Sequence, residues 1–288
     1  MTTTIAPVPP AAARTRHAGR RRTRSSARTV LAIVLLCFML FPVYWMFNIS
    51  LQATGGTLVS TFLPTDPSLE GYRLAIEDQG KNLVTSLIIA VGTVILTLVV
   101  AAPAAYALAQ FRFRWINWAL LAILICQMIP GIVIANALYT LYENLGLLNT
   151  IPGLIIANSA NAIPFGVLIM RSFMLGVPSS IVEAARVDGA GLVRSFLSIV
   201  VPISRNSLIT VGLFTFLWAW SDFLFALTLT TKGDVVPVTL GIYTYLGQHV
   251  SNWSAVMATA MLASVPAIIL LVIAQKYIAA GATGGALK

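Results

Sequence analysis

Hydrophobic residues are gathered into six long runs, and shorter polar stretches separate one run from the next. Each run is long enough to cross a bilayer core as a helix, which takes about 20 residues. The runs cover residues 29–51, 83–108, 116–141, 151–170, 208–229 and 255–278. The pattern predicts an all-α integral membrane protein with six transmembrane helices. Several runs contain proline or glycine, so we expect kinked helices that pack against one another.

Composition narrows the class of protein further. The chain is 58% hydrophobic and only 9% charged, whereas soluble domains carry about 25% charged residues. An ordinary soluble fold is therefore excluded. The two cysteines, Cys37 and Cys126, both fall inside apolar runs, where cysteine behaves as a small hydrophobic residue, and they indicate no disulfide.

The basic residues are divided unevenly between the two sides that six spans define. With a cytoplasmic N-terminus, fifteen Lys and Arg lie on the inner side, and only Arg73, Lys81 and Lys232 lie on the outer side. The positive-inside rule predicts this asymmetry. We therefore place both termini in the cytoplasm, with the chain a multi-pass membrane protein.

The two ends of the chain differ from the apolar runs. Residues 1–27 are rich in Arg, Pro and Ala, and we predict a disordered cytoplasmic tail because such a segment buries little apolar area. Its arginine cluster is typical of a topology signal before a first span, so we expect membrane lipid and no nucleic acid as a partner. Residues 28–280 form the six-helix domain, and residues 281–288 form a cytoplasmic C-terminal tail.

The longest inner loop, residues 172–207, has helix signals of its own. Ser180 and Glu183 have the spacing of a capping box, which predicts a short helix starting there. The helix is expected to end at Gly189, where a turn with positive φ is easily made. A second amphipathic stretch runs from Leu192 to about Val201. The loop is therefore predicted to be a helix–turn–helix elbow beneath the membrane.

The sequence of this elbow resembles the Glu-Ala-Ala loop of ABC importer permeases. The resemblance rests on Glu183-Ala184-Ala185, then Asp188-Gly189-Ala190, then Ile199 and Val201-Pro202. Further segments resemble the sugar-importing, maltose-type branch in the same order, and they are 63–64, 69–72, 146–150, 164–165, 220–223 and 281–288. Two positions depart from that pattern: Ser221 stands where Asn is common, and Asn206 where Pro is common.

The resemblance implies a type I ABC importer architecture and a set of partners. It implies that the chain forms half of the pore of a binding-protein-dependent sugar importer. The partners implied are a second permease subunit, two ATP-binding subunits and an extracytoplasmic sugar-binding protein. Glu183 would make the charged contact to the ATP-binding subunit, Ala184 and Ala185 would permit close approach, and Gly189 would supply the bend. Asp188 belongs to the same coupling motif, and the resemblance also implies a place in the inner membrane of a bacterial cell.

No nucleotide, metal or catalytic site is found in the sequence. The only Gly-Lys pair, Gly80-Lys81, lacks the upstream glycine of a Walker A loop and falls on the predicted outer side. No Cys or His pairing has metal-ligand spacing. We therefore expect no cofactor on this chain, ATP and Mg²⁺ on the partner subunit, and a protein that is not itself an enzyme.

Polar residues inside the apolar runs are the candidates for a substrate path, because unpaired polar groups in lipid are costly. Asp222 and Trp218 are four residues apart in the fifth run, and a helix would place them on one face. Asn158 and Asn161 share a face in the fourth run, and Gln127 interrupts the third. The alternative for the Asn and Gln side chains is an interhelical hydrogen bond that holds the bundle together.

Three other functions remain open at this point. An ion-coupled secondary transporter would show inverted repeats with broken helices, and no such repeat is evident in the sequence. An ABC importer could also carry a different solute, such as glycerol phosphate. A scaffolding membrane protein would not need a glycine-hinged cytoplasmic elbow.

Overall fold

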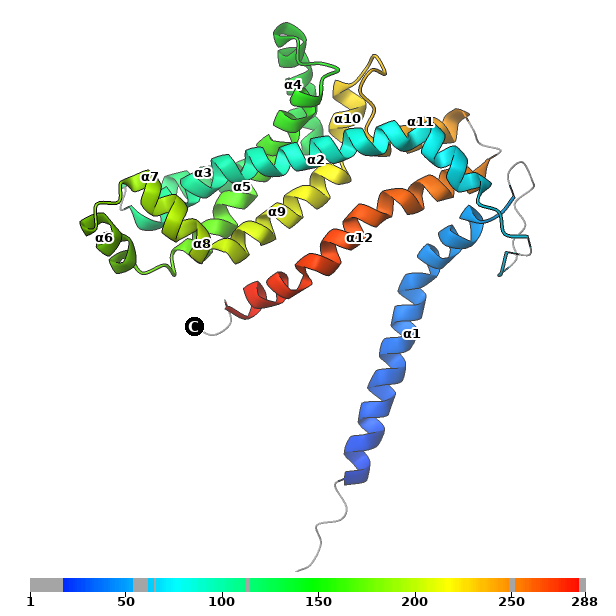
Figure 1. The fold of residues 1–288 in the computed structure, drawn as a ribbon, viewed down its shortest axis with the longest axis horizontal. Coiled ribbons are helices and arrows are strands. Elements are labelled where there is room, and N and C mark those ends of the chain that lie inside the picture. Colours follow the sequence, from blue (N-terminus) through cyan, green and yellow to red (C-terminus); the bar gives the residue numbers. More distant parts are fainter. Residues whose placement is uncertain (1–17, 54–61, 65, 112–113, 249–251, 285–288) are drawn as a thin grey trace, which may run out of the picture.

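The computed structural model describes residues 18–53, 62–64, 66–111, 114–248 and 252–284, and within these ranges all regular structure is helical. Four helices are long and apolar enough to cross a membrane by themselves, and the number rises to six if two sharply bent helix pairs each count as one span. The expectation of an all-α protein with several apolar helices long enough to span a membrane is confirmed. Figure 1 shows the arrangement of the helices.

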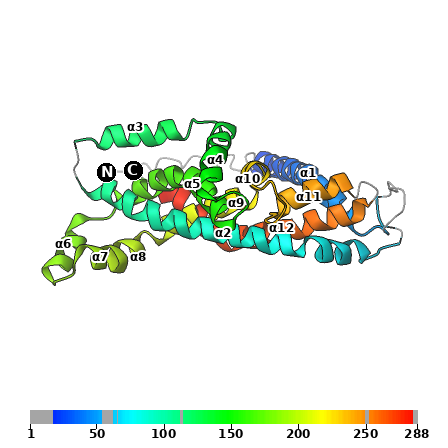
Figure 2. The same cartoon turned by 90° about the horizontal axis from the view of Figure 1, so that it is seen from above.

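The centre of the molecule is a bundle of four long helices. These are α2 (Glu70–Gln110), α5 (Ile151–Met174), α9 (Arg205–Trp220) and α12 (Trp253–Gly284). They lie side by side in both ribbon views (Figures 1 and 2). Small residues at the crossings allow this approach: a Cβ added at Gly166 of α5 would lie 3.2 Å from the Ala101 side chain on α2 and 3.1 Å from that of Val211 on α9. Close contact between small residues is the usual basis of helix packing in lipid.

Helix α1 (Ala18–Ser50) stands apart from this bundle for most of its length (Figure 1). Near the C-terminal end of α1, the helix contacts α12. The helix begins at Ala18, although residues 18–27 were expected to be disordered. Ala and Arg favour helix, and extending an existing helix needs no new nucleus, so the polar segment continues it. The rest of the predicted tail, residues 1–17, lies outside the described residues.

The third apolar run is not a single helix, contrary to expectation. It forms α3 (Ile116–Cys126) and α4 (Gly131–Leu145), which are bent by 91° relative to each other. Pro130 precedes α4 with an extended backbone. Because proline lacks an N–H and restricts the residue before it, the chain turns here rather than continuing one helix. None of the residues of α3 is buried within the chain.

The fifth run is also broken. Helix α9 ends at Trp220, and a short helix α10 (Leu224–Leu229) follows after Ser221–Phe223. Asp222 and Trp218 therefore do not share a helix, which corrects the prediction. At its other end α9 joins the elbow helices through a bend of 79°.

Two differences occur near the C-terminus. Helix α11 (Val238–Gln248) lies in what was expected to be an outer loop. Val238 and Leu240 are buried, and the Val238 N–H donates to the Ser86 hydroxyl at 2.8 Å, so this helix packs on α2. Helix α12 continues to Gly284, past the expected start of the tail at residue 281; residues 285–288 lie outside the described part of the chain.

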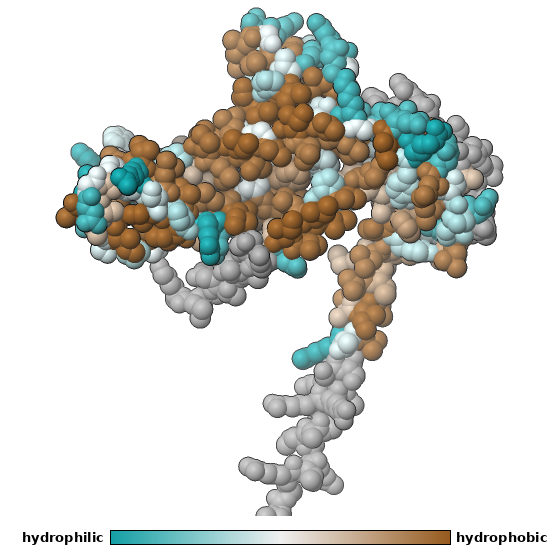
Figure 3. Space-filling view, viewed as in Figure 1, coloured by the Kyte–Doolittle hydropathy of each residue, from teal (hydrophilic) through white to brown (hydrophobic). Residues whose placement is uncertain are grey.

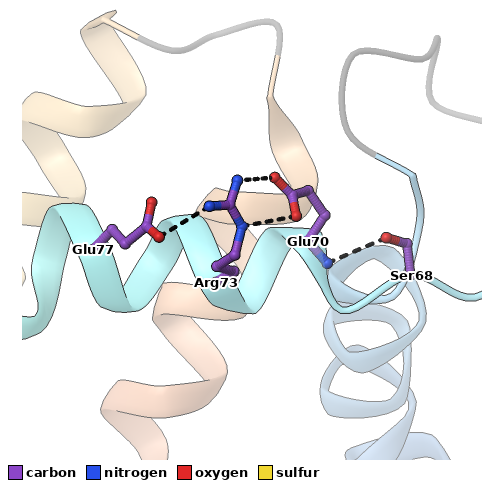
Figure 4. A network of polar contacts seen from close by, with 4 residues as sticks. All are labelled: Ser68, Glu70, Arg73 and Glu77. Carbon is purple, nitrogen blue, oxygen red and sulfur yellow. Dashed lines mark hydrogen bonds and ion pairs between the residues drawn. The ribbon is translucent and has the colours of Figure 1, made fainter.

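The surface follows the division between lipid-facing and aqueous regions. Figure 3 shows apolar side chains over most of the visible face of the bundle, with polar ones gathered at the elbow, at the tip of α4 and at the start of α2. At the start of α2 an exposed network joins Arg73 to Glu70 and Glu77, and the Ser68 hydroxyl accepts the Glu70 N–H (Figure 4). Exposed pairs of this kind stabilise a helix end only weakly.

Candidate functional site

The loop between α5 and α9 forms the predicted elbow, at the end of the bundle remote from the start of α2 (Figure 1). Its first arm is α6 (Ser179–Val187). Its second arm is built from α7 (Leu192–Ser195), the π-helical turn η1 (Phe196–Val200) and α8 (Val201–Ile203). The helix–turn–helix expectation is therefore correct in outline.

The bend between the two arms is a glycine-terminated helix end. Gly189 has φ +88°; its N–H donates to Arg186 O at 3.1 Å, and the Ala190 N–H donates to Ala185 O at 2.9 Å. These two bonds form the Schellman motif, in which a left-handed residue satisfies the last carbonyl groups of a helix. The predicted role of Gly189 as the bend is confirmed by this geometry.

The predicted capping box is wrong. Helix α6 begins at Ser179, its N-cap position is Pro178, and no side chain caps it. Pro178 has an extended backbone with φ −62° and ψ 126°. The proline itself starts the helix, since its ring fixes φ, so Ser180 falls inside the first turn, too late to act as the cap. Glu183 is consequently not committed to a capping bond.

The second arm contains a π-helical turn, which the sequence analysis missed. The Val201 N–H donates to Phe196 O, five residues earlier. Pro202 follows directly, and a proline ring clashes with the carbonyl four residues before it, here that of Ser198. The wider π turn relieves this crowding. Such turns are rare and often lie at functional positions.

A few side chains fix the elbow to the bundle. Val182 of α6 and Val200 of η1 are buried in the same cluster as Met174 and Val211. The Phe196 ring packs on Tyr106 of α2, with centroids 5.3 Å apart. The elbow is therefore attached to α2 and α5 through apolar contacts along one face.

Two reciprocal hydrogen-bonding contacts lie at the root of the elbow. Gln110, the last residue of α2, donates through Nε2 to Met174 O at 3.0 Å and to Val177 O at 3.1 Å. Arg171 of α5 donates through Nε to Leu108 O at 3.1 Å. Each side chain thus donates to carbonyl groups at or just beyond the end of the neighbouring helix, where backbone partners are fewer. Movement of the elbow is in this way tied to both helices.

The opposite face of the elbow is open to solvent. Glu183, Ala184 and Asp188 are exposed, Ala185 is half-buried, and Val187 is 89% exposed. Among the described residues, Glu183 has no hydrogen-bond or ion-pair partner. An apolar tip beside an unpaired carboxylate, on a short helix that is held from behind, is a surface suited to a protein partner.

A second feature is an open polar cavity of about 380 Å³ beside α5 and the C-terminal end of α9. All four predicted substrate-path residues, Trp218, Asp222, Asn158 and Asn161, line it, together with Gln127. The other lining residues are Ile129, Gly131, Ser221 and Phe225. The two breaks in the helices, at residues 127–130 and 221–223, therefore meet α5 at one place. The sequence analysis named most of these polar groups without showing that they converge.

The side chains of the cavity differ in exposure and in hydrogen bonding. Trp218 is 44% exposed and packs edge-on against Phe165, with ring centroids 4.8 Å apart. Asn161 is exposed, whereas Asn158 is buried and donates through Nδ2 to Asp222 at 3.4 Å. The expected interhelical hydrogen bond is thus present for Asn158. Asn161 and Trp218 are the more accessible groups.

Comparison with known proteins identifies a family. The family described as "Binding-protein-dependent transport system inner membrane component" matches residues 98–283, a range that contains both the elbow and the cavity. The diacetylchitobiose uptake system permease protein DasC of Streptomyces coelicolor is 30% identical over 263 residues, covering 90% of this chain and 95% of its own. The trehalose transport system permease protein SugB of Mycobacterium tuberculosis is 30% identical over 269 residues, covering 92% and 98%.

Solved structures agree on the fold. A chain in the crystal structure of a bacterial ABC transporter involved in the import of the acidic polysaccharide alginate superposes with a TM-score of 0.77 at 22% identity, covering 93% of this chain and 99% of that one. The family comprises permease subunits of ABC importers, which are not themselves enzymes. This chain belongs to the binding-protein-dependent transport system inner membrane components, and is a multi-pass protein of the bacterial inner membrane.

Proposed function

We propose that this chain forms one half of the translocation path of an ABC importer for carbohydrates and receives the energy of ATP hydrolysis through the elbow. The observation that carries the proposal is the exposed face of α6, with an unpaired Glu183 beside the tip at Val187. This surface is held from behind by apolar contacts and by the contacts of Gln110 and Arg171. A force on α6 would therefore reach the ends of α2 and α5.

The proposed partners rest on the family to which the chain belongs. We propose that two separate ATP-binding subunits hold ATP and Mg²⁺, that a second permease subunit completes the pore, and that an extracytoplasmic binding protein delivers the solute. The family's description as binding-protein-dependent supports the last of these. Gly80 and Lys81 lie within α2, so they offer no phosphate-binding loop.

The substrate class is proposed from relatives and from the chemistry of the cavity. Relatives named for the uptake of diacetylchitobiose and trehalose support a carbohydrate. Trp218 offers an aromatic face for the apolar side of a sugar, and Asn161 offers an amide for its hydroxyl groups. We propose that Trp218, Asn158, Asn161 and Asp222 line the path through which the solute passes.

The test is solute-stimulated ATPase activity of the co-expressed complex in lipid. Glu183→Ala and Gly189→Pro are expected to abolish stimulation by the loaded binding protein while the complex stays assembled, since one removes the contact and the other the bend. Glu143→Ala is the matched control, because Glu143 is an exposed carboxylate on α4, outside the elbow. Full stimulation in both elbow variants would refute the coupling role.

The same preparation separates the proposal from an ion-coupled transporter. An importer driven by ATP requires the ATP-binding subunits for uptake into proteoliposomes, and a proton or sodium gradient alone would not support it. Uptake by the chain without an ATPase, driven by an ion gradient, would favour the secondary transporter instead.

A further inference from the structure

We propose that Asp222 is a positioning residue: its carboxylate holds the break between α9 and α10 and orients Asn158, and it does not contact the transported solute. The proposal rests on the proposed function, since it assigns separate roles within the cavity. Its basis is the set of hydrogen bonds that Asp222 makes inside the protein.

The carboxylate oxygens of Asp222 are directed to groups of the protein itself. Oδ1 accepts the Phe225 N–H at 3.2 Å, and Oδ2 accepts the Ala226 N–H at 3.2 Å. Oδ2 also accepts the Asn158 side-chain N–H at 3.4 Å. A carboxylate that receives three N–H donors has most of its accepting capacity filled. A solute hydroxyl would have to displace one of these donors to bind there.

The backbone of Asp222 ties a third helix to the same point. Its carbonyl oxygen accepts the Thr239 hydroxyl of α11 at 2.5 Å, and its N–H donates to Ala219 O at 3.4 Å. One residue thus connects α5, α9, α10 and α11 where the chain is not helical. Asp222 precedes the N-cap residue Phe223, but its oxygens accept N–H groups of the first turn of α10 and so cap the helix as an N-cap side chain does.

Helix α10 depends on this cap because it is short. It has six residues, far fewer than an isolated helix needs to be stable in water. Its Phe225 and Leu229 are buried against α4 and α5, in the cluster that contains Tyr142 and Leu154. The hydrogen bonds of Asp222 to the first turn of α10 therefore fix the position of α10, and with it the position of α4, which packs on α10.

The contact to Asn158 orients the amide in the cavity wall. Asn158 Nδ2 donates both to Leu154 O at 3.0 Å and to Asp222 Oδ2. With both amide protons committed, Oδ1 is the atom of Asn158 that is left to accept a bond from a solute. The solute is accordingly expected to contact Asn158 Oδ1 and the more exposed side chains of Asn161 and Trp218.

Three substitutions at one position test the proposal. Asp222→Asn removes the charge and keeps one oxygen, which in the place of Oδ2 still accepts the Ala226 N–H and the Asn158 amide N–H, whereas the new NH2 group cannot accept the Phe225 N–H. Asp222→Glu keeps the charge but moves it by one methylene, and Asp222→Ala removes every contact. Positioning predicts that Asp222→Asn, which can keep the contact to Asn158, retains uptake to within about threefold, whereas Asp222→Glu and Asp222→Ala lose about tenfold or more. Asp234→Ala, at an exposed carboxylate between α10 and α11, is the control.

A second readout reports the cavity without transport. In the assembled complex, with Cys37 and Cys126 replaced by serine, Asn161→Cys serves as a reporter labelled by a small hydrophilic maleimide. Its labelling rate is expected to be unchanged by Asp222→Asn and altered severalfold by Asp222→Ala and Asp222→Glu. A general loss of stability would lower the amount of complex instead, and would leave the rate per assembled complex unchanged.

The outcomes separate the two proposals. Uptake that survives in Asp222→Glu but fails in Asp222→Asn would show that the solute needs the charge, and would overturn the positioning role. An Asp222→Ala variant that matches wild type in both readouts would overturn it as well. If the wild-type complex imports no carbohydrate, the proposed function fails, but the labelling rates still decide whether Asp222 positions the wall.

Discussion

Two glycines at the bend of the elbow have different backbone conformations. Gly189 has φ +88° and Gly191 has φ −66°, and neither has a neighbouring atom within 4 Å of the place where a Cβ would be. Space is therefore equal at the two positions, and only the conformation differs. A Cβ in the left-handed region costs about 1–2 kcal/mol.

This difference gives a prediction with a matched control. Gly189→Ala is expected to destabilise the end of α6 by about 1 kcal/mol, and Gly191→Ala to have little effect. Hydrogen exchange of the amides of residues 184–190 in the assembled complex measures it, with exchange about fivefold faster in the first variant only. Equal exchange in both variants would contradict the role of the left-handed conformation.

Sequence reasoning succeeded at Gly189 and failed at Ser180 for physical reasons that differ. Few residues other than glycine adopt positive φ readily, so a glycine directly after a short amphipathic segment is a specific sign that the helix ends there. A Ser-x-x-Glu spacing is less restrictive, because a proline just before it can start the helix one residue earlier and leave the serine without a capping role. Here Pro178 decided the start of α6.

At the scale of elements, the crossing of α2, α5 and α9 depends on the absence of a side chain at Gly166. Gly212 of α9 offers a comparison, since a Cβ there would meet only Val94 and Leu98 side chains, at 3.5 and 3.7 Å. Gly212 also lines an apolar groove of about 350 Å³ between α2, α9 and α12. Both glycines lie inside helices, but an added Cβ would have closer neighbours at Gly166 than at Gly212.

Gly166→Val is expected to destabilise the bundle by about 1–3 kcal/mol, because added methyl groups would separate packed helices. Gly212→Val is expected to be better tolerated, since its methyl groups would enter the groove. The thermal midpoint of the purified complex in one detergent measures the difference. A Gly166 variant as stable as the Gly212 variant would show that the crossing adapts freely.

The root of the elbow gives a second prediction at this scale. Gln110→Ala removes two hydrogen bonds to the end of α5, each worth about 1 kcal/mol. Amides of residues 175–187 are expected to exchange about tenfold faster, and solute-stimulated ATPase activity to fall. Gln275→Ala, at an exposed glutamine of α12, tests for a general effect of losing an amide. Unchanged exchange in Gln110→Ala would mean that apolar packing alone holds the elbow.

The length of an apolar run does not predict whether the helix within it is broken. Hydropathy located the third and fifth runs correctly, but it does not distinguish a straight helix from two helices that meet at 91°. The breaks depend on tertiary contacts as well as on local signals: Pro130 is visible in the sequence, whereas the α10 cap at Asp222 needs Asn158 from another span. The convergence of both breaks on one cavity required the fold.

On the scale of the whole molecule, the elbow and the start of α2 lie at opposite ends of the bundle (Figure 1). Helix α2 has 41 residues, or about 60 Å at 1.5 Å per residue, which exceeds the thickness of a bilayer of about 40–45 Å including its headgroups. Positive-inside asymmetry places the elbow in the cytoplasm. Residues at the two ends are therefore expected on opposite sides of the membrane.

Cysteine labelling checks this topology. With Cys37 and Cys126 replaced by serine, Val187→Cys at the elbow is expected to react with an impermeant maleimide only in inside-out vesicles. Leu69→Cys, just before α2, is expected to react only in right-side-out preparations; Val187 and Leu69 are 89% and 70% exposed. Labelling of both from the same side would contradict the arrangement of spans.

The π turn at Phe196–Val200 has a consequence for the evolution of chain length. A π turn holds one residue more than an α-helical turn over the same stretch, so it can lose one residue and close as ordinary α-helix. Elsewhere in a helix, a single deletion rotates all that follows by about 100° and turns buried faces outward. Natural relatives that are one residue shorter are thus expected to have their gap here, with the elbow unchanged.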